Sequence, residues 1–386
     1  MKIGIDARFL THPQQGGFKT YTTNLVEAIS NLDIDDQFVI YLDRPPTSQD
    51  VLPHSENIVY KVVPLRLPGI GMPYREQVEL QQHIRKDRLD LIHFLCNSAP
   101  VNTTQNYVIT LHDIIQISNS EFRIRRNFSE QKQWALRTYS KWAIQKTVPD
   151  AKGILTVSHY EKGKISQGLN IPPEKIFVTH LAPSNIFNPA SQATIELFRK
   201  QVRDKFGLDE KFILGIGYEP RKNIPLLIRS FSIVAAKYPN INLVVVAAHE
   251  EKKKYFQKLC SEQGLDGRTV ILGKVIPEDL VQLYNLAELF VFPSERESFG
   301  LPPLEALACG TPAIAMNMTS LPEILGEGAL LIDSKDEERW ADTIIQVLSN
   351  DDLRNQLIKQ GLKQASHKNW EACARETIQV YHSVVY

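Results

Sequence analysis

Residues 289–315 read LFVFPSERESFGLPPLEALACGTPAIA, and this stretch decides the fold class. An apolar strand ends at Phe292, a loop containing Gly300 follows, a helix opens near Pro302, and a second apolar run spans Pro312–Ala315. Proline is tolerated in the first turn of a helix, so its position indicates where the helix begins. A buried strand, a helix and another buried strand in succession are typical of a βαβ unit with parallel strands.

The same alternation of short apolar runs and helical patterns extends along the whole chain. The remaining segments that we expect to be strands are Lys2–Ile5, Phe38–Leu42, Ile58–Val63, Asp90–Phe94, Tyr107–Leu111, Gly153–Val157, Ile176–Thr179, Phe212–Ile216, Leu243–Ala248, Thr269–Leu272 and Ala329–Ile332. Between the first two, the apolar residues Tyr21, Leu25, Ala28, Ile29 and Leu32 share one helical face. The pattern predicts an α/β protein whose parallel sheets are covered by helices on both faces.

The chain of 386 residues is too long for one layered core, and its strands are too many for one open sheet. The best break is the polar, proline-bearing stretch His180–Pro189. We therefore predict one domain over residues 1–185, completed by a C-terminal amphipathic helix within 370–386, and another over 186–369. Ligands of such sheets bind beyond the carboxyl ends of the strands, so two facing sheets predict a site in the cleft between them.

Composition excludes several classes of protein. Hydrophobic residues make up 43% and charged residues 23%, as in a globular domain. Forty-four basic residues balance forty-four acidic ones, which argues against a nucleic-acid partner. The four cysteines form no C-x-x-C pair. We expect no signal peptide in MKIGIDARFL, because Asp6 and Arg8 stand where it needs an unbroken apolar run. The longest strongly apolar stretch has six residues, against the ~20 that a membrane helix needs. We expect a cytoplasmic protein, and peripheral attachment to a membrane stays open.

Two loops carry residues suited to an anion. Gly16 and Gly17 lie between the first strand and the first helix, where backbone can approach a ligand closely, although an ordinary turn would look the same. Gly217-Tyr-Glu-Pro-Arg221-Lys222-Asn223 follows a strand and precedes a helix. Two cations at a helix N-terminus oppose its dipole, which favours a bound phosphate over a solvated surface pair.

Two carboxylates lie eight residues apart in the stretch quoted first. Glu297 belongs to the loop, whereas Glu305 belongs to the helix and is flanked by apolar residues. A buried carboxylate needs partners, and a pair of sugar hydroxyls would satisfy both of its oxygens. The alternative is a helix carboxylate paired with a nearby arginine or lysine.

Taken in order, GGFKTYTTNL, the THD of Thr110–Asp113, GYEPRKN, and the E-x7-E of Glu297 and Glu305 resemble the motifs of glycosyltransferase family 4. The resemblance covers essentially the whole chain, and the ordered set is more specific than any one member. It implies a retaining nucleotide-sugar glycosyltransferase of the GT-B fold, with two facing Rossmann-like domains and a cleft between them. The first domain would serve the acceptor and the second the donor.

The resemblance also implies roles for particular residues. Gly16 and Gly17 match the loop whose amides approach the donor diphosphate, and His112 matches the histidine near the 6-hydroxyl of the donor sugar. Arg221 and Lys222 match the basic segment that binds the diphosphate. Many relatives carry an arginine soon after the glycine that ends this strand, whereas here Tyr218 follows Gly217, which makes Lys222 the leading cation.

The E-x7-E segment supplies the remaining predicted contacts. Glu297 matches the carboxylate at the sugar 3-hydroxyl, followed by backbone amides at Phe299, Gly300 and Leu301. Glu305 matches the glutamate that binds the ribose.

Other patterns are weaker. Asp33-Ile-Asp35 resembles a D-x-D metal pattern, but it follows the first helix in a polar turn, and the histidines and cysteines show no zinc spacing. We therefore predict no metal and no cofactor. The basic and aromatic stretch Phe122–Phe128, before a helix carrying Trp134 and Trp142, would suit a lipid-linked acceptor or an anionic membrane surface, although an exposed helix start explains it as well.

We expect a hexosyltransferase of polysaccharide biosynthesis that uses a nucleoside-diphosphate sugar and a glycan or lipid-linked acceptor. UDP-glucose is the favoured donor and GDP-mannose the next. The catalytic residues would be His112, Lys222 and Glu297. Two alternatives stay open: a nucleotide-sugar 2-epimerase on the same fold, and a non-catalytic protein that binds sugar nucleotides. The acceptor and the oligomeric state are not specified by the sequence.

Overall fold

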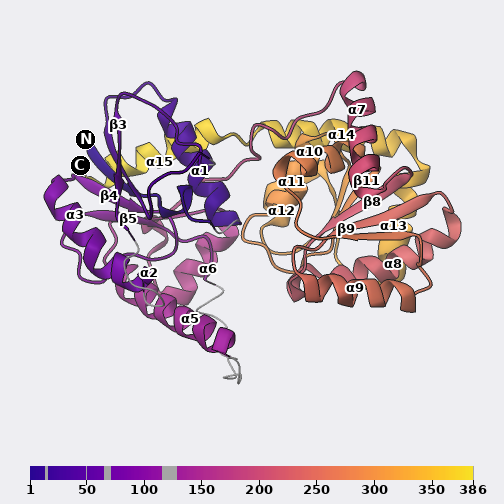
Figure 1. The fold of residues 1–386 in the computed structure, drawn as a ribbon, viewed down its shortest axis with the longest axis horizontal. Coiled ribbons are helices and arrows are strands. Elements are labelled where there is room, and N and C mark those ends of the chain that lie inside the picture. Colours follow the sequence, from indigo (N-terminus) through magenta and orange to yellow (C-terminus); the bar gives the residue numbers. More distant parts are fainter. Residues whose placement is uncertain (14–15, 49, 65–70, 115–127, 386) are drawn as a thin grey trace. The chain divides into compact units, whose positions relative to one another are not determined.

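The computed structural model describes residues 1–13, 16–48, 50–64, 71–114 and 128–385 (Figure 1). The chain divides into two compact units: the N-terminal unit, Met1–Leu181 with Trp370–Tyr386, and the C-terminal unit, Ala182–Asn369. The expected boundary after residue 185 lies four residues beyond Leu181.

Seven parallel strands form the sheet of the N-terminal unit in its described part. Their order is β3-β2-β1-β4-β5-β6-β7. They span β1 Lys2–Asp6, β2 Gln37–Leu42, β3 Ile58–Val62, β4 Leu91–Phe94, β5 Tyr107–Thr110, β6 Gly153–Thr156 and β7 Ile176–Val178. Because the chain runs outward from β1 in both directions, the carboxyl ends of β1 and β4 meet at the point where the strand order reverses.

Helices cover this sheet. They are α1 Gly17–Ser30, α2 Gly71–Tyr74, α3 Leu80–Asp87, α5 Phe128–Thr147, α6 His159–Leu169 and α15 Trp370–Val385. Apolar residues of α3, α5 and α6 join one core with the side chains on one face of the strands. Helix α15, the last in the sequence, packs against α1 and β6 (Figure 1). The expected C-terminal amphipathic helix therefore belongs to the N-terminal unit.

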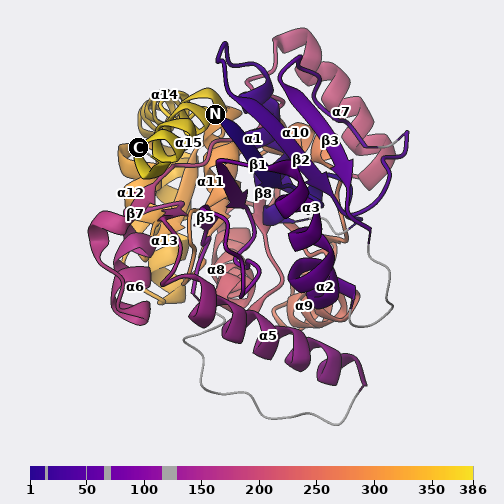
Figure 2. The same ribbon diagram turned by 90° about the vertical axis from the view of Figure 1, so that its left-hand side faces the viewer.

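The C-terminal unit repeats this architecture with six parallel strands in the order β10-β9-β8-β11-β12-β13. They span β8 Lys211–Ile216, β9 Ile241–Val246, β10 Thr269–Leu272, β11 Leu289–Phe292, β12 Ala313–Met316 and β13 Leu330–Ile332. Its helices are α7 Gln192–Phe206, α8 Ile224–Lys237, α9 Glu250–Glu262, α10 Pro277–Leu286, α11 Leu301–Ala308, α12 Leu321–Leu325, α13 Glu337–Ser349 and α14 Asp351–Ser366. Helices α8, α9 and α13 pack together, and so do α7, α10, α11 and α14 (Figures 1 and 2).

The α/β class with two parallel sheets is confirmed, and every segment predicted as a strand contains one. Asp33-Ile-Asp35 lies in the exposed connection between α1 and β2, as expected of a turn. The stretch Phe122–Asn127 lies outside the described residues, as does the side chain of Trp134. None of the helices in the described ranges is long and apolar enough to cross a membrane.

A buried network of charges lies at the carboxyl end of β1. One oxygen of Asp6, Oδ1, accepts from both terminal nitrogens of Arg75 at 3.1 Å, and the other accepts from Nε of Arg8 at 2.8 Å. Arg8 also donates to Glu76 at 2.8 Å. All four side chains are buried. Burial alone would raise the pKa of Asp6, but the two guanidinium groups outweigh it and hold that pKa below its usual value.

We predict that Asp6→Ala strongly destabilises the protein. It leaves two buried guanidinium groups without their shared counter-charge, and breaking a buried ion pair in this way costs about 3–5 kcal/mol. Urea denaturation of the purified variant measures the loss. Glu371→Ala is the control, because its pair with Arg375 on α15 is exposed and contributes at most about 0.5 kcal/mol. Losses of equal size in the two variants would contradict the assignment.

Candidate functional site

The predicted basic segment and the E-x7-E segment meet in the C-terminal unit. Their loops follow β8 and β11, which are neighbours in the sheet, so both loops lie at the same edge. The backbone N–H of Glu295 donates to the carbonyl of Arg221 at 2.8 Å, and the Ser294 hydroxyl donates to the same carbonyl at 3.3 Å. The two segments are therefore held together by the backbone itself.

At the centre of this junction lies the carboxylate of Glu297. Its Oε1 accepts from Nζ of Lys222 at 2.7 Å and also from the hydroxyl of Ser294. Nη1 of Arg221 lies 3.2 Å from the same oxygen. Lys222 and Glu297 are both buried, and Nζ of Lys222 lies 4.7 Å from the centroid of the Phe292 ring. None of these contacts uses Oε2 of Glu297, so the cluster holds one carboxylate oxygen and leaves the other out of the pairing.

Gly217 is required for this arrangement. Its φ of +148° lies in a region that side chains rarely adopt. A Cβ there would lie 2.6 Å from both Cβ and Cγ of Lys222. The stem of Lys222 can therefore fold over this position only when it is glycine. Tyr218, which stands where an arginine was expected, stacks against the His249 ring at 5.7 Å.

The loop from Glu297 to α11 is fixed from the neighbouring loop after β12. The Glu297 N–H donates to the Thr319 hydroxyl at 3.0 Å, and the Ser320 hydroxyl donates to the carbonyls of Glu297 and Phe299, each at 3.0 Å. Gly300 caps α11 with a φ of +102°, and a Cβ there would lie 2.5 Å from Leu321. Because Pro302 and Pro303 carry no N–H, the first turn of α11 offers an anion the amide of Leu301.

Glu305 extends from α11 into the same region. Its Oε2 accepts from the Tyr284 hydroxyl at 3.2 Å. Burial raises the pKa of Glu305 to about 7, against the opposing effects of the Tyr284 hydrogen bond and the charge of Lys222. The partner of Glu305 is therefore a tyrosine hydroxyl. The alternative to a sugar ligand, a carboxylate paired with a nearby arginine or lysine, predicted a different partner.

The N-terminal unit carries the other predicted residues. Gly16 caps α1 with a φ of +130°, and a Cβ at Gly16 or Gly17 would meet nothing within 4 Å, so this helix start is open. His112 follows β5. Its Nε2 donates to the Leu95 carbonyl at 3.0 Å, and its backbone N–H donates to the Asn97 side chain at 2.8 Å.

The environment of His112 favours a neutral imidazole. Burial lowers its pKa. Because a carbonyl can only accept, Nε2 carries the proton and Nδ1 is left as an acceptor. The rings of Phe18 and Tyr21 contact the imidazole edge-on, with centroids at 5.1 and 4.7 Å. His112 is therefore a rigidly held acceptor suited to a hydroxyl.

The predicted residues thus fall into two groups. Arg221, Lys222, Glu297, Phe299, Gly300, Leu301 and Glu305 lie in the C-terminal unit, and Gly16, Gly17 and His112 lie in the N-terminal unit. Sequence reasoning missed Ser294, Tyr284, Thr319 and Ser320, which hold the two glutamates and their loop. Thr319 and Ser320 follow the strand after the E-x7-E helix, and the rule that carboxyl ends of adjacent parallel strands meet would have pointed to them.

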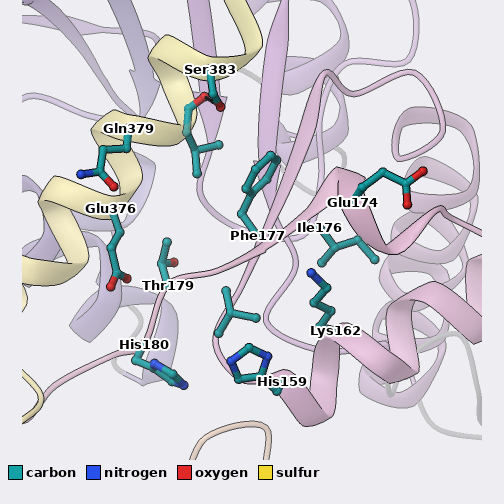
Figure 3. Close-up of a pocket in the computed structure, with 12 residues that line it drawn as sticks. His159, Lys162, Glu174, Ile176, Phe177, Thr179, His180, Glu376, Gln379 and Ser383 are labelled. Carbon is teal, nitrogen blue, oxygen red and sulfur yellow. Dashed lines mark hydrogen bonds between the residues drawn. The ribbon is translucent and has the colours of Figure 1, made fainter.

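A separate cavity of about 620 Å³ lies in the N-terminal unit, along the edge strand β7 between α6 and α15 (Figure 3). Its charged lining combines Lys162 with Glu174 and Glu376, and His159 and His180 lie at one end (Figure 3). None of the predicted site residues lines it. Because its lining carries charges of both signs, this cavity does not favour an anionic ligand, whereas the loops after β8 and β11 do.

Comparison with known proteins gives a consistent set of relatives. Residues 15–182 match the profile described as Glycosyltransferase Family 4, and residues 198–364 match the one described as Glycosyl transferases group 1. The chain is 32% identical over 302 residues to the O-antigen chain mannosyltransferase B of Escherichia coli, covering 77% of this chain and 75% of that protein. It is 28% identical over 283 residues to the serotype-specific mannosyltransferase WbdA of Escherichia coli, covering 72% of this chain and a third (33%) of that protein.

Solved structures share the fold. Sucrose-phosphate synthase from Thermosynechococcus elongatus superposes with a TM-score of 0.74 at 21% identity, covering 99% of this chain and 98% of that chain. WaaG, a glycosyltransferase involved in lipopolysaccharide biosynthesis, superposes with a TM-score of 0.73 at 12% identity, covering 98% and 99%. At these identities the likeness establishes the architecture.

We predict that Glu305 makes the stability of the protein fall between about pH 4.5 and pH 7. The folded state binds the Glu305 proton more tightly than the unfolded state does, because its pKa is raised from 4.5 to about 7. The stabilisation is therefore complete below the lower value and is lost as the pH rises through the higher one. Denaturant unfolding across this range, compared between wild type and Glu305→Gln, measures the effect. The variant should show a flatter pH dependence, whereas the exposed control Glu327→Gln should follow wild type. Parallel curves for wild type and Glu305→Gln would refute the prediction.

Proposed function

The chain belongs to glycosyltransferase family 4 and is a glycosyltransferase of the GT-B type, and from this premise we propose that it transfers a hexose, with retention of anomeric configuration, from a nucleoside-diphosphate sugar to a glycan or lipid-linked acceptor. The C-terminal unit binds the donor, and the N-terminal unit receives the acceptor. The observation that carries this proposal is the cluster of Lys222, Arg221 and Glu297 at the ends of β8 and β11.

Lys222 is suited to stabilise the leaving diphosphate. An ammonium group has three N–H donors, and the described contact with Glu297 occupies one of them. The remaining donors, with the Arg221 guanidinium, can bind phosphate oxygens while Glu297 keeps the ammonium in place. Fixed positive charge aimed at the developing negative charge of a leaving group is a main source of catalysis.

The transfer needs no protein nucleophile. The bond from the anomeric carbon to the phosphate oxygen breaks, and the bond from that carbon to the acceptor oxygen forms on the same face. The acceptor proton passes to the departing phosphate oxygen. Glu297, through the oxygen that the cluster leaves out of the pairing, and His112, through Nδ1, bind hydroxyls of the transferred sugar and hold its anomeric carbon in line.

Glu305 is proposed to bind the ribose. A carboxylate can accept from both ribose hydroxyls at once, and Tyr284 holds it in place from Oε2. Its pKa of about 7 means that ribose hydroxyls would bind together with loss of its proton near neutral pH.

For the transferred sugar we propose mannose, delivered from GDP-mannose, with UDP-glucose as the second candidate. The two Escherichia coli relatives are both named mannosyltransferases, which supports mannose. The sequence-based preference for UDP-glucose rests on no side-chain contact to the base. The O-antigen name of one relative supports a role in polysaccharide synthesis.

The proposal is tested by incubating the protein with GDP-mannose and, separately, with UDP-glucose, and following the products by NMR. Release of the nucleoside diphosphate with an α-linked or α-anomeric product supports retaining transfer, and the faster donor identifies the sugar. Conversion of the sugar at C2 would instead indicate the epimerase. Binding without turnover of either donor in the presence of a membrane extract would indicate the non-catalytic alternative.

We predict that the two glutamates respond differently to loss of charge. Glu305→Gln should weaken binding of the free nucleoside diphosphate as well as of the full donor, because both contain ribose, and a lost charge-assisted hydrogen bond costs about 1.5–3 kcal/mol. Glu297→Gln should spare binding of the nucleoside diphosphate and depress turnover. Isothermal titration calorimetry and initial rates separate the two effects.

Equal effects of the two variants on nucleoside-diphosphate affinity would show that this division of roles is wrong. Thermal unfolding of both variants serves as the control for folding. An unfolded variant would favour a structural carboxylate at that position.

A further inference from the structure

A chain of hydrogen bonds runs along one face of the sheet of the N-terminal unit, beneath α1 and α15, which pack against each other. The Tyr381 hydroxyl on α15 lies 2.6 Å from Nδ1 of His93 on β4. Nε2 of the same imidazole lies 2.7 Å from the Thr110 hydroxyl on β5, and that hydroxyl lies 3.1 Å from the Tyr21 hydroxyl on α1. Three hydroxyls and one imidazole thus join the C-terminal helix to the first helix through two central strands.

This chain of hydrogen bonds is buried and consists of uncharged groups. All four side chains are fully buried. Burial lowers the pKa of His93 to about 3, so the imidazole is neutral at physiological pH and has one donor and one acceptor nitrogen. Burial also raises the pKa of both tyrosines. The hydrogen bonds therefore run continuously through neutral groups, with each ring nitrogen of His93 bound to a hydroxyl.

The chain of hydrogen bonds ends at Tyr21, whose ring contacts His112. The Tyr21 ring meets the His112 ring edge-on at 4.7 Å and an interplanar angle of 85°. Thr110, which holds the Tyr21 hydroxyl, precedes His112 by two residues. The Thr110 carbonyl also accepts from the N–H of Asn97, whose side chain accepts from the N–H of His112. The position of the His112 ring thus depends on where the chain of hydrogen bonds places Thr110 and Tyr21.

Such a chain is an unusual choice for stability alone. Replacing both partners of a buried hydrogen bond by apolar groups of the same shape can be nearly neutral for stability. What a fully satisfied polar network adds is a unique geometry. Sub-ångström placement of a group that contacts the substrate affects turnover strongly.

We propose that Tyr381, His93, Thr110 and Tyr21 form a positioning relay, through which the C-terminal helix fixes the His112 ring for the donor sugar. The four are positioning residues, since they act through His112. The inference rests on the proposed function for the role of His112, but the relay itself is a property of the N-terminal unit.

The kinetic test uses Tyr381→Phe, which removes the hydroxyl and keeps the ring. The matched control is Tyr107→Phe, because Tyr107 is a buried tyrosine of β5 whose hydroxyl donates to the Thr147 carbonyl outside the relay. With GDP-mannose we expect Tyr381→Phe to lower kcat about tenfold with little change in KM, the pattern of a group misplaced at the reacting sugar. The preference for GDP-mannose over its 6-deoxy analogue should fall as well. Tyr107→Phe should alter neither quantity.

A second pair of variants separates positioning from folding. Thr110→Val removes the central hydroxyl at nearly constant shape, whereas Thr110→Ser keeps the hydroxyl and removes only the methyl group. We expect Ser to recover kcat and the discrimination between the two donors, whereas Val behaves like Tyr381→Phe. If all variants change only Tm, with kcat and donor discrimination as in wild type, the relay is structural and the proposal is overturned.

An NMR measurement that needs no turnover tests the relay even if the protein acts on no sugar nucleotide. The ring nitrogens of ¹⁵N-labelled histidine are observed by NMR, and His112→Gln assigns the signals of His112. Tyr381→Phe should shift or broaden them, and Tyr107→Phe should not. An unchanged His112 spectrum in Tyr381→Phe would overturn the relay. Absence of donor turnover by wild type, with a changed spectrum in the variant, would overturn the proposed function alone.

Discussion

One carboxylate oxygen, Oε1 of Glu297, accepts hydrogen bonds from Lys222 and Ser294 and pairs with the Arg221 guanidinium at 3.2 Å, and the proposed chemistry of the C-terminal unit depends on this junction. A buried ammonium requires a counter-charge, and Glu297 supplies it while joining the loops after β8 and β11. Gly217 is needed because the Lys222 stem lies where a Cβ would be. The cations are therefore held in fixed positions, which is what the proposed electrostatic catalysis requires.

The N-terminal unit also buries polar groups, and it pairs them through different residues. Asp6, Arg8, Arg75 and Glu76 balance one another at the end of β1, whereas neutral groups from Tyr381 to Tyr21 lie behind His112. In these clusters each buried polar side chain has hydrogen-bond or ion-pair partners, as the cost of burying an unpaired polar group requires. This constraint places rigid polar groups at the carboxyl ends of the strands, where ligands of parallel sheets bind.

Much of the fold could be predicted from the sequence, because buried parallel strands appear as short apolar runs between helical patterns. The motifs also singled out Lys222 and Glu297 as candidate site residues. Their contact joins residues 75 positions apart, and the bond of His93 to Tyr381 joins residues 288 apart. Such pairs depend on strand order and on the return of α15 to the first sheet, which local patterns do not encode. Ser294 and Thr319 were missed because a lone hydroxyl has no distinctive spacing in the sequence.

The most direct test of the central claim is the rate of nucleoside-diphosphate release by Lys222→Ala, measured beside wild type with the preferred donor. If the Lys222 ammonium stabilises the departing diphosphate, the rate should fall by roughly 10²-fold or more, as for the loss of one transition-state-stabilising donor. Lys200→Ala, an exposed change on α7 of the same unit, should leave the rate unchanged. A Lys222→Ala protein with near-normal turnover and unaltered donor affinity would contradict the assignment of the junction as the diphosphate site.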